Sequence, residues 1–134
     1  MPFQKLRYHI VTGTYQGLSL ITPEIEKPLY KLMQDEASTL SGKLIAIGGI
    51  ENHVHAVGII PASITIAEFI LKVKNNSSRK IKQLYEAHQD FYWQKGYGVF
   101  TLDPQHLTQV IQYVNNQKHH HSDGTLVEYL EKME

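Results

Sequence analysis

Four residues of the chain form a candidate set whose side chains could together bind a metal ion and attack a phosphate. His53 and His55 are separated by a single valine, and Tyr113 and Gln117 are separated by three residues. Imidazole nitrogens and an amide oxygen can together bind a divalent ion. A tyrosine hydroxyl beside such an ion can act as a nucleophile toward phosphorus. The four residues therefore predict metal-assisted cleavage and rejoining of a phosphodiester strand.

His53 and His55 are expected to lie on one face of a strand, because successive strand residues point to opposite faces. Their Cα atoms would then be roughly 7 Å apart, a spacing from which two imidazoles can bind one ion. The alternative is that both histidines face solvent on a sheet, which is the commoner explanation of a single His-x-His pair. The pair by itself leaves both interpretations open.

Tyr113 and Gln117 are four residues apart on a predicted helix, so they lie on one side of it, one turn apart. Gln117 would lie nearer to the buried stripe than Tyr113, which falls at its edge and could face a cleft. A metal ion would help to ionise the tyrosine, whose usual pKa is about 10. Alternatively, Tyr113 is a core-edge residue and Gln117 is solvated. The following run, His119 to His121, could continue the site, because His120 and His121 lie one turn beyond Asn116 and Gln117. We prefer to interpret all three as histidines that favour the C-terminal end of a helix dipole.

These residues must be positioned by elements that the sequence predicts in the order β-α-β-β-α-β-α. The expected strands cover residues 3–14, 44–50, 53–60 and 91–102, and the expected helices cover about 22–40, 65–85 and 103–120. Thr22-Pro23 and Asp103-Pro104 are typical helix starts, with an N-cap followed by proline. Gly124 precedes a short tail with a helical pattern. The first six elements match a ferredoxin-like α+β fold, a four-stranded antiparallel sheet with helices packed on one face.

Composition narrows the class of protein. The chain has 134 residues, 42% of them hydrophobic, and we expect one domain over residues 1–134. The sequence has no cysteine, which excludes a disulfide framework and fits a cytoplasmic protein. We expect no signal peptide and no membrane span, because no apolar run approaches the roughly 20 residues that a span needs. The formal net charge of zero gives no general support for a nucleic-acid partner.

A local basic segment lies within the second predicted helix. Its five basic residues, with no acidic residue among them, are Lys72, Lys74, Arg79, Lys80 and Lys82. We interpret this segment as a candidate DNA-binding surface, and a solvated helix face is the alternative. Four aromatic residues between positions 92 and 100 could stack on unpaired bases, although an aromatic strand is more often part of a core.

Five segments of the chain form a recognisable series. They are Tyr-His-Ile-Val at 8–11, Leu-Ile-Thr-Pro-Glu at 20–24, Asn-His-Val-His at 52–55, Phe-Tyr-Trp-Gln-Lys-Gly-Tyr-Gly-Val-Phe at 91–100 and Val-Ile-Gln-Tyr-Val-Asn-Asn-Gln at 110–117. In this order and spacing they resemble the single-tyrosine HUH transposases of the insertion-sequence-200 type and their REP-associated relatives. HUH denotes two histidines around a bulky hydrophobe, here His53, Val54 and His55.

The resemblance implies that His53, His55 and Gln117 bind a divalent ion, Mg²⁺ or Mn²⁺, and that Tyr113 attacks single-stranded DNA. The product would be a 5′-phosphotyrosine link and a free 3′-hydroxyl, and a second transfer would rejoin strands. The resemblance also implies a homodimer whose sheets join, and DNA hairpins at element ends as the recognition target.

Two other classes of function stay open at this point. The first is a domesticated DNA-hairpin-binding module with an inactive site, which would bind DNA without forming a covalent adduct. The second is a histidine-rich metal-binding or sensing protein, which would take up metal without any dependence on DNA.

Overall fold

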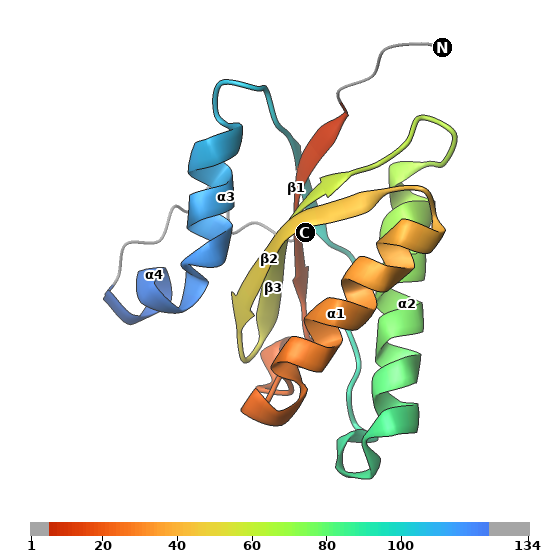
Figure 1. Ribbon diagram of the computed structural model, residues 1–134. Helices are drawn as coiled ribbons and strands as arrows, with labels where there is room; N and C mark the ends of the chain where they lie inside the picture. Colours follow the sequence, from red (N-terminus) through yellow and green to blue (C-terminus); the bar gives the residue numbers. More distant parts are fainter. Residues whose placement is uncertain (1–5, 124–134) are drawn as a thin grey trace.

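The structure, a computed structural model, describes residues 6–123. Four antiparallel strands form one sheet in the order β2-β3-β1-β4 (Figure 1). The strands are β1 (Arg7–Gly13), β2 (Lys43–Ile50), β3 (His53–Ile59) and β4 (Gly98–Thr101). The helices are α1 (Pro23–Thr39), α2 (Ile66–Leu84), α3 (Leu107–Asn115) and α4 (Gln117–Asp123), with 3-10 turns η1 (Tyr15–Gly17) and η2 (Glu86–His88). The predicted α+β class is confirmed. The first residues of the first predicted strand and the predicted tail after Gly124 lie outside the described residues.

The starts of the helices follow from local chemistry. Pro23 occupies the first turn of α1, as predicted, since a missing N–H costs nothing at a helix start. The Thr65 side chain accepts a hydrogen bond from the Glu68 amide at 3.1 Å and so caps α2. Asp103 Oδ1 accepts from the His106 amide at 3.0 Å just before α3. Hydrogen bonding with the His106 side chain, whose Nδ1 lies 2.9 Å from Asp103 Oδ1, holds the pKa of the Asp103 carboxyl below its usual range.

Both faces of the sheet are covered, by different helices. Helices α1 and α2 pack together on one face, where Ile25, Leu29 and Phe69 join Val54 in the larger core cluster. Helix α3 lies on the opposite face, where Val110 and Val114 belong to a smaller cluster (Figure 1). The predicted packing of helices on one face therefore holds for α1 and α2 and does not extend to α3.

Two elements are shorter than the sequence predicts. Only Gly98–Thr101 of the segment 91–102 pairs as β4, because Gly96, with a φ of 87°, turns the chain before it. Upstream of this turn, Trp93 forms an isolated bridge with Thr14. The predicted helix over 103–120 begins only at Leu107, because residues 104–106 form a turn, so the predicted start at Asp103-Pro104 is wrong. The helix is also divided at Asn116, whose φ of −109° and ψ of 27° are not helical. This division turns α4 away from the axis of α3.

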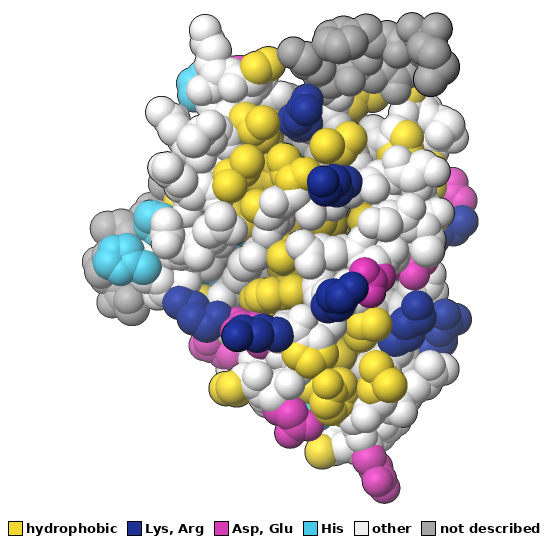
Figure 2. All heavy atoms as spheres, in the orientation of Figure 1, with side chains coloured by type: hydrophobic (Ala, Val, Ile, Leu, Met, Phe, Trp, Pro, Cys, Tyr) yellow, Lys and Arg dark blue, Asp and Glu magenta, His cyan; other side chains and the backbone are white. Residues whose placement is uncertain are grey.

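The face seen in Figure 2 is not a continuous basic surface. Lys and Arg side chains are spread over it, with acidic and hydrophobic side chains between them. This distribution fits the formal net charge of zero. Within residues 6–123, no helix is both long and apolar enough to pass through a bilayer.

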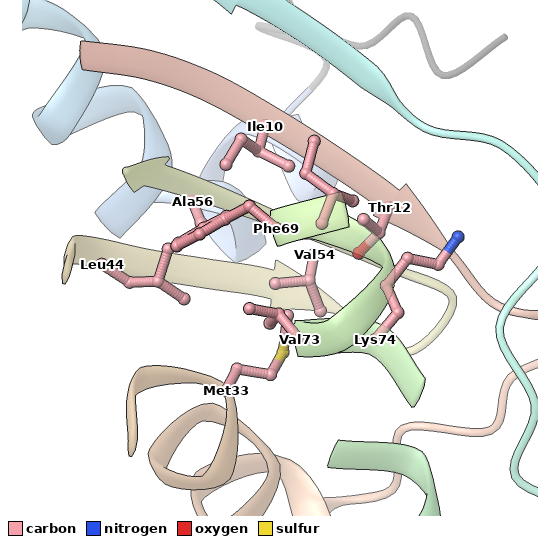
Figure 3. Close-up of a pocket in the computed structure, with 10 residues that line it drawn as sticks. Ile10, Thr12, Met33, Leu44, Val54, Ala56, Phe69, Val73 and Lys74 are labelled. Atoms are coloured by element: carbon pink, nitrogen blue, oxygen red, sulfur yellow. The ribbon is translucent and has the colours of Figure 1, made fainter. Parts of the chain in front are cut away.

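A small cavity lies in the core between α2, α1 and the sheet. Its apolar lining includes Ile10, Met33, Val54 and Phe69, with Thr12 and Lys74 at one end (Figure 3). Its volume of about 20 Å³ is close to that needed for a single water molecule. The cavity is therefore too small to hold a substrate.

Candidate metal and tyrosine site

His53 and His55 share the sheet face that α3 covers, as the strand period predicts. Val54 between them belongs to the core on the opposite face. His53 is 6% exposed and His55 is fully buried, so the solvent-facing alternative is wrong. In the sheet register, Gly13 of β1 pairs with His53 and therefore places no side chain beside its imidazole. The two imidazole centroids are 5.1 Å apart.

Tyr113 reaches this histidine pair because α3 lies unusually close to β2. A Cβ atom on Gly48 would lie only 2.2 Å from the carbonyl oxygen of Val114, so only glycine permits this approach. Gly48 pairs with His55 in the sheet, so the close contact between Gly48 and Val114 lies next to the histidines. The Tyr113 ring is 5.8 Å from the His55 ring and is stacked on His120 at 4.5 Å. Tyr113 is 6% exposed.

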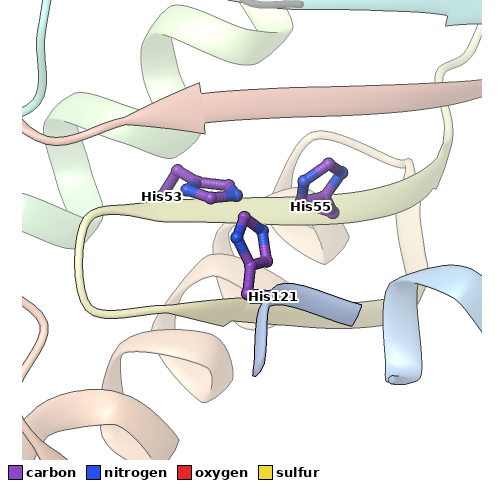
Figure 4. Close-up of side chains that lie close together, drawn as sticks. All are labelled: His53, His55 and His121. Carbon is purple, nitrogen blue, oxygen red and sulfur yellow. The ribbon is translucent and has the colours of Figure 1, made fainter. Parts of the chain in front are cut away.

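His121 is a member of the site that the sequence analysis considered but did not prefer. Figure 4 shows its imidazole pointing from α4 toward the two strand histidines. One ligand atom from each of His53, His55 and His121 lies within 4.8 Å of the others, and the ring centroids of His53 and His121 are 4.7 Å apart. His121 does lie in the last turn of α4, as the helix-end interpretation predicts, but that interpretation did not include its place beside the strand histidines. The spacing of four from Gln117 was the available signal.

Gln117 is buried beside this cluster, with 1% of its surface exposed, so the solvated alternative is wrong for this residue. Its Oε1 accepts a hydrogen bond from His121 Nε2 at 3.1 Å. Its Nε2 donates to the backbone carbonyl of Tyr113 at 3.4 Å. The side chain of Gln117 thus connects the helix of Tyr113 to the imidazole of His121.

Helix α4 is fixed to the rest of the fold by Lys118. The Lys118 ammonium forms an ion pair with Glu26 of α1 and donates to the Gly49 carbonyl at 3.3 Å. Glu26 also accepts from the Tyr30 hydroxyl at 3.3 Å, and burial together with this carboxylate raises the pKa of Tyr30. Tyr30 therefore stays a neutral donor. These contacts hold the helix that carries His121 against β2.

Further hydrogen bonds orient the strand histidines. His53 Nδ1 donates to Asn52 Oδ1 at 2.9 Å, so Nε2 is the nitrogen through which His53 would bind an ion. His55 Nδ1 shares a hydrogen bond with His9 Nε2 at 2.8 Å, and both rings are fully buried. Such partners fix the tautomer and the ring orientation of metal-binding histidines.

The chemistry of the donor set fits a divalent ion. Zinc-type sites bind imidazole nitrogens at about 2.1 Å, which places tetrahedral ligand atoms about 3.4 Å from one another. The observed limit of 4.8 Å for His53, His55 and His121 requires only a modest movement of the side chains. Neutral imidazole is a common ligand of transition metals, and buried histidines need no counter-charge when they are neutral.

The predicted basic surface is only partly present. Lys74 is 5% exposed, and its ammonium donates to the carbonyls of Gln94 and Gly96, both at 2.8 Å. The prediction of DNA binding is therefore wrong for Lys74, because the side chain holds the turn before β4 instead. Burial also lowers the pKa of this lysine. Lys72 pairs with Glu68 one turn away at 3.2 Å.

An open groove lies along the C-terminal half of α2. Its volume is about 440 Å³, and its lining includes Asn75, Arg79, Lys82 and Tyr92. The Lys82 ammonium lies 3.4 Å from the centroid of the Tyr92 ring, which is 53% exposed. Lys80 is half-buried on the same helix and does not line the groove.

Among the four aromatic residues considered for base stacking, Tyr92 alone lies exposed on the surface. Trp93 and Tyr97 pack against the larger core cluster, and Phe100 contacts His9 with ring centroids 5.8 Å apart. The expectation that most of these aromatics are core residues is therefore confirmed.

The chain is similar to proteins that move DNA. The family model described as "Transposase IS200 like" matches residues 2–117. A crystal structure of a candidate transposase from Deinococcus radiodurans R1 has a TM-score of 0.69 and 22% identity, covering 87% of this chain and 93% of that chain. A REP-associated tyrosine transposase bound to a REP hairpin has a TM-score of 0.63 and 11% identity, covering 89% and 74% respectively. At these identities the two structures support the fold alone. No curated protein sequence matches the chain significantly.

Proposed function

Because the chain belongs to the IS200-like transposase family, we propose that it cuts and rejoins single-stranded DNA through Tyr113 with the help of a divalent metal ion. His53 and His55 are the proposed ligands from β3, and the third ligand comes from the pair Gln117 and His121. The observation that carries the proposal is the 5.8 Å separation between the rings of Tyr113 and His55. A phenol beside a histidine cluster is the arrangement that metal-assisted attack on phosphorus requires.

The proposed first step exchanges one phosphate ester for another. The Tyr113 hydroxyl loses its proton and attacks the phosphorus of a DNA phosphodiester. The bond between phosphorus and the 3′ oxygen breaks, and that oxygen takes up a proton and leaves as a hydroxyl. In the second step, a 3′-hydroxyl attacks the phosphotyrosine, and the tyrosine oxygen leaves and regains a proton. Each step keeps the number of ester bonds constant, so the reaction consumes no nucleotide cofactor.

A bound Mg²⁺, Mn²⁺ or similar ion would withdraw charge from the phosphate and favour in-line displacement. Residues of the protein would determine where this ion lies relative to Tyr113. Asn52 and His9 orient the two strand histidines through hydrogen bonds of 2.9 Å and 2.8 Å. The close contact at Gly48 holds Tyr113 on the same side of the sheet.

DNA must gain access to a site that is largely covered. Tyr113 is 6% exposed and His55 is fully buried. We infer that α3 and α4 move away from the sheet when a strand binds. The smaller core cluster, with Val110 and Val114 from α3, is the apolar contact that such a movement would open.

The proposed DNA partner is a single strand that carries a hairpin. A solved structure of similar fold was determined with a REP hairpin bound, and we extend that class of ligand to this chain. The groove along α2 is the proposed contact surface, because Arg79 and Lys82 can meet phosphates and the exposed Tyr92 can stack on a base. Lys72 and Lys80 are peripheral members of this surface.

We also propose that the protein is a homodimer and that residues 1–134 form a single domain. The match of the family over residues 2–117 supports the single domain. Strands β2 and β4 are the edges of the described sheet, so either could pair with a second copy. Size-exclusion chromatography with light scattering at several protein concentrations tests the homodimer, and a monomer at all concentrations would contradict it.

The experiment that tests the function uses a single-stranded oligonucleotide library with random sequence around a fixed hairpin. One sample is labelled at the 3′ end and the other at the 5′ end, and both are incubated with the protein and Mn²⁺. Because the proposed link is a 5′-phosphotyrosine, the 3′ label should stay with the protein in a denaturing gel, whereas the 5′ label should be released on a shorter DNA. Metal chelation should prevent both changes.

The other outcomes separate the remaining classes of function. DNA binding without any covalent adduct in Mn²⁺ would favour a hairpin-binding module over a transferase. A 5′ label that follows the protein would show the opposite polarity of cleavage and would refute the proposed step.

A further inference from the structure

We propose that His121, rather than Gln117, is the third protein ligand of the ion. The resulting site of three imidazoles would bind transition-metal ions such as Co²⁺ and Zn²⁺ in preference to Mg²⁺. The inference deepens the proposed function, because it names the class of ion for the same site. The inference rests on the proposed function in one respect, which is that the site binds a metal ion.

The first argument is the convergence of three imidazoles from two separate elements. Ligand atoms of His53, His55 and His121 lie within 4.8 Å of one another, and the His53 ring is edge-on to both of the other rings. Figure 4 shows the imidazole of His121 reaching across from α4 to the face of β3. His121 and His120 are both half-buried, whereas His119 is exposed. Only the last histidine of the run joins the strand pair.

The second argument is the contact made by the amide oxygen of Gln117. This oxygen accepts from His121 Nε2 at 3.1 Å, while the amide nitrogen donates to the Tyr113 carbonyl at 3.4 Å. An amide fixed at both ends orients the imidazole that it touches, as the partners of metal-binding histidines commonly do. Gln117 is then a positioning residue, and His121 is the group that contacts the ion.

The third argument is the chemistry of the ligands. An oxygen ligand such as a glutamine carbonyl suits Mg²⁺, which prefers oxygen and keeps several of its waters. Imidazole nitrogen suits Co²⁺, Ni²⁺, Cu²⁺ and Zn²⁺, whose affinity for such sites exceeds that of Mn²⁺ in the usual order. Replacement of the one oxygen ligand by a third nitrogen therefore moves the preference of the site from Mg²⁺ toward transition metals.

The experiment measures metal binding by the full chain in the absence of DNA. Isothermal titration with Co²⁺, Zn²⁺ and Mg²⁺ is performed on the wild type and on His53→Ala, His121→Ala, Gln117→Ala and His119→Ala. His119 is the matched control, because it belongs to the same histidine run and is exposed. Circular dichroism verifies that each variant is folded, and substitution of the partly exposed His121 is not expected to disturb the core.

Removal of a residue that hydrogen-bonds to a metal ligand typically lowers metal affinity by about 10–100-fold, and removal of the ligand itself should cost at least as much. His53→Ala and His121→Ala should therefore lower Co²⁺ affinity by about 100-fold or more. Gln117→Ala should lower it by about 10–100-fold through the loss of orientation. His119→Ala should leave affinity unchanged, and the wild type should bind Co²⁺ and Zn²⁺ more tightly than Mg²⁺. Wild-type affinity in His121→Ala, or equal affinity for Mg²⁺ and Co²⁺, would overturn the inference.

A spectroscopic measurement separates a ligand from a residue that acts only through structure. With Cu²⁺ bound, pulsed electron paramagnetic resonance detects the remote nitrogen of each coordinated imidazole. We expect three imidazoles in the wild type, three in Gln117→Ala and two in His121→Ala, and an unchanged count in His121→Ala would contradict the assignment. Because none of these measurements uses DNA, this inference can fail while the covalent adduct forms in Mn²⁺, and it can hold while no adduct forms.

Discussion

His9 Nε2 lies 2.8 Å from His55 Nδ1, and the two fully buried rings are stacked with centroids 5.0 Å apart. His9 comes from β1 and His55 from β3, so the contact joins two neighbouring strands beneath α3. Partners of this kind orient metal-binding histidines, and their removal typically lowers metal affinity by about 10–100-fold. His9 therefore acts on the proposed ion through His55.

Substitution of His9 tests this relationship. His9→Leu keeps an apolar side chain of similar size but removes the hydrogen bond, so Co²⁺ affinity should fall by about 10–100-fold. His9→Gln can place an amide near the position of Nε2 and should retain most of the affinity. Isothermal titration measures both. Equal affinities in the two variants would show that His9 contributes packing alone.

Substitution of Tyr113 tests the nucleophile. Tyr113→Phe removes one oxygen and preserves the ring that stacks on His120 at 4.5 Å. Formation of the DNA adduct should be abolished, because phenylalanine has no oxygen that can form the phosphate ester. Hairpin affinity, measured by fluorescence anisotropy, should stay within about twofold of wild type, since the phenol is not needed for binding. Tyr15→Phe is the control, because Tyr15 is exposed outside the proposed groove, and its adduct should form normally.

Substitution of Gly48 tests whether the close approach between α3 and β2 is needed for stability and for activity. A Cβ at this position would lie 2.2 Å from the Val114 carbonyl oxygen, so Gly48→Ala must push α3 outward. We expect a loss of about 1–3 kcal/mol in the free energy of unfolding, measured in urea, together with slower adduct formation. At Gly58, a Cβ would meet the side-chain ends of Ile10 and Leu44 at 3.1 and 3.3 Å, which can adjust. Gly58→Ala should therefore cost less, and an equal cost would contradict the account.

Lys74 should influence stability through its pKa. Burial lowers this pKa below the usual 10.5, so the unfolded chain binds more protons than the folded chain between the lowered value and 10.5. Stability contributed by Lys74 therefore rises with pH across that window. Lys74→Met should remove this rise in the free energy of unfolding measured on the alkaline side. A rise that persists unchanged in the variant would assign it to another group.

The DNA groove is tested by the salt dependence of binding. Arg79→Gln and Lys82→Gln should each reduce the slope of log affinity against log salt by about 0.7–0.9, the contribution of one phosphate contact. Lys74→Met should leave the slope unchanged, because the Lys74 ammonium is buried against two backbone carbonyls. Wild-type slopes in both groove variants would remove this surface from the interface.

Much of the fold follows from local sequence signals. The alternation around Val54 correctly assigns His53 and His55 to one face, because the strand period of two leaves a single choice once Val54 is buried. Thr22-Pro23 correctly marks the start of α1, whereas α3 begins at Leu107, three residues after Pro104. These features depend on neighbours in the chain, which a sequence displays directly.

The parts that sequence reasoning missed depend on distant contacts. His9 appears as an ordinary strand residue until the pairing of β1 with β3 brings it to His55. Lys74 appears as part of a basic helix face until the carbonyls of the turn before β4 reach it. His121 joins the site because the chain leaves the helical path at Asn116, and no glycine or proline between residues 110 and 120 marks this change of direction.

The measurement that tests the central claim most directly is mass spectrometry of the protein after reaction with the hairpin library and Mn²⁺. Nuclease treatment and proteolysis should leave one peptide that carries a 5′-nucleotide, and fragmentation should assign the phosphate to Tyr113. A nucleotide on any other residue, or an unmodified Tyr113 in a reaction that has cut the DNA, would contradict the account.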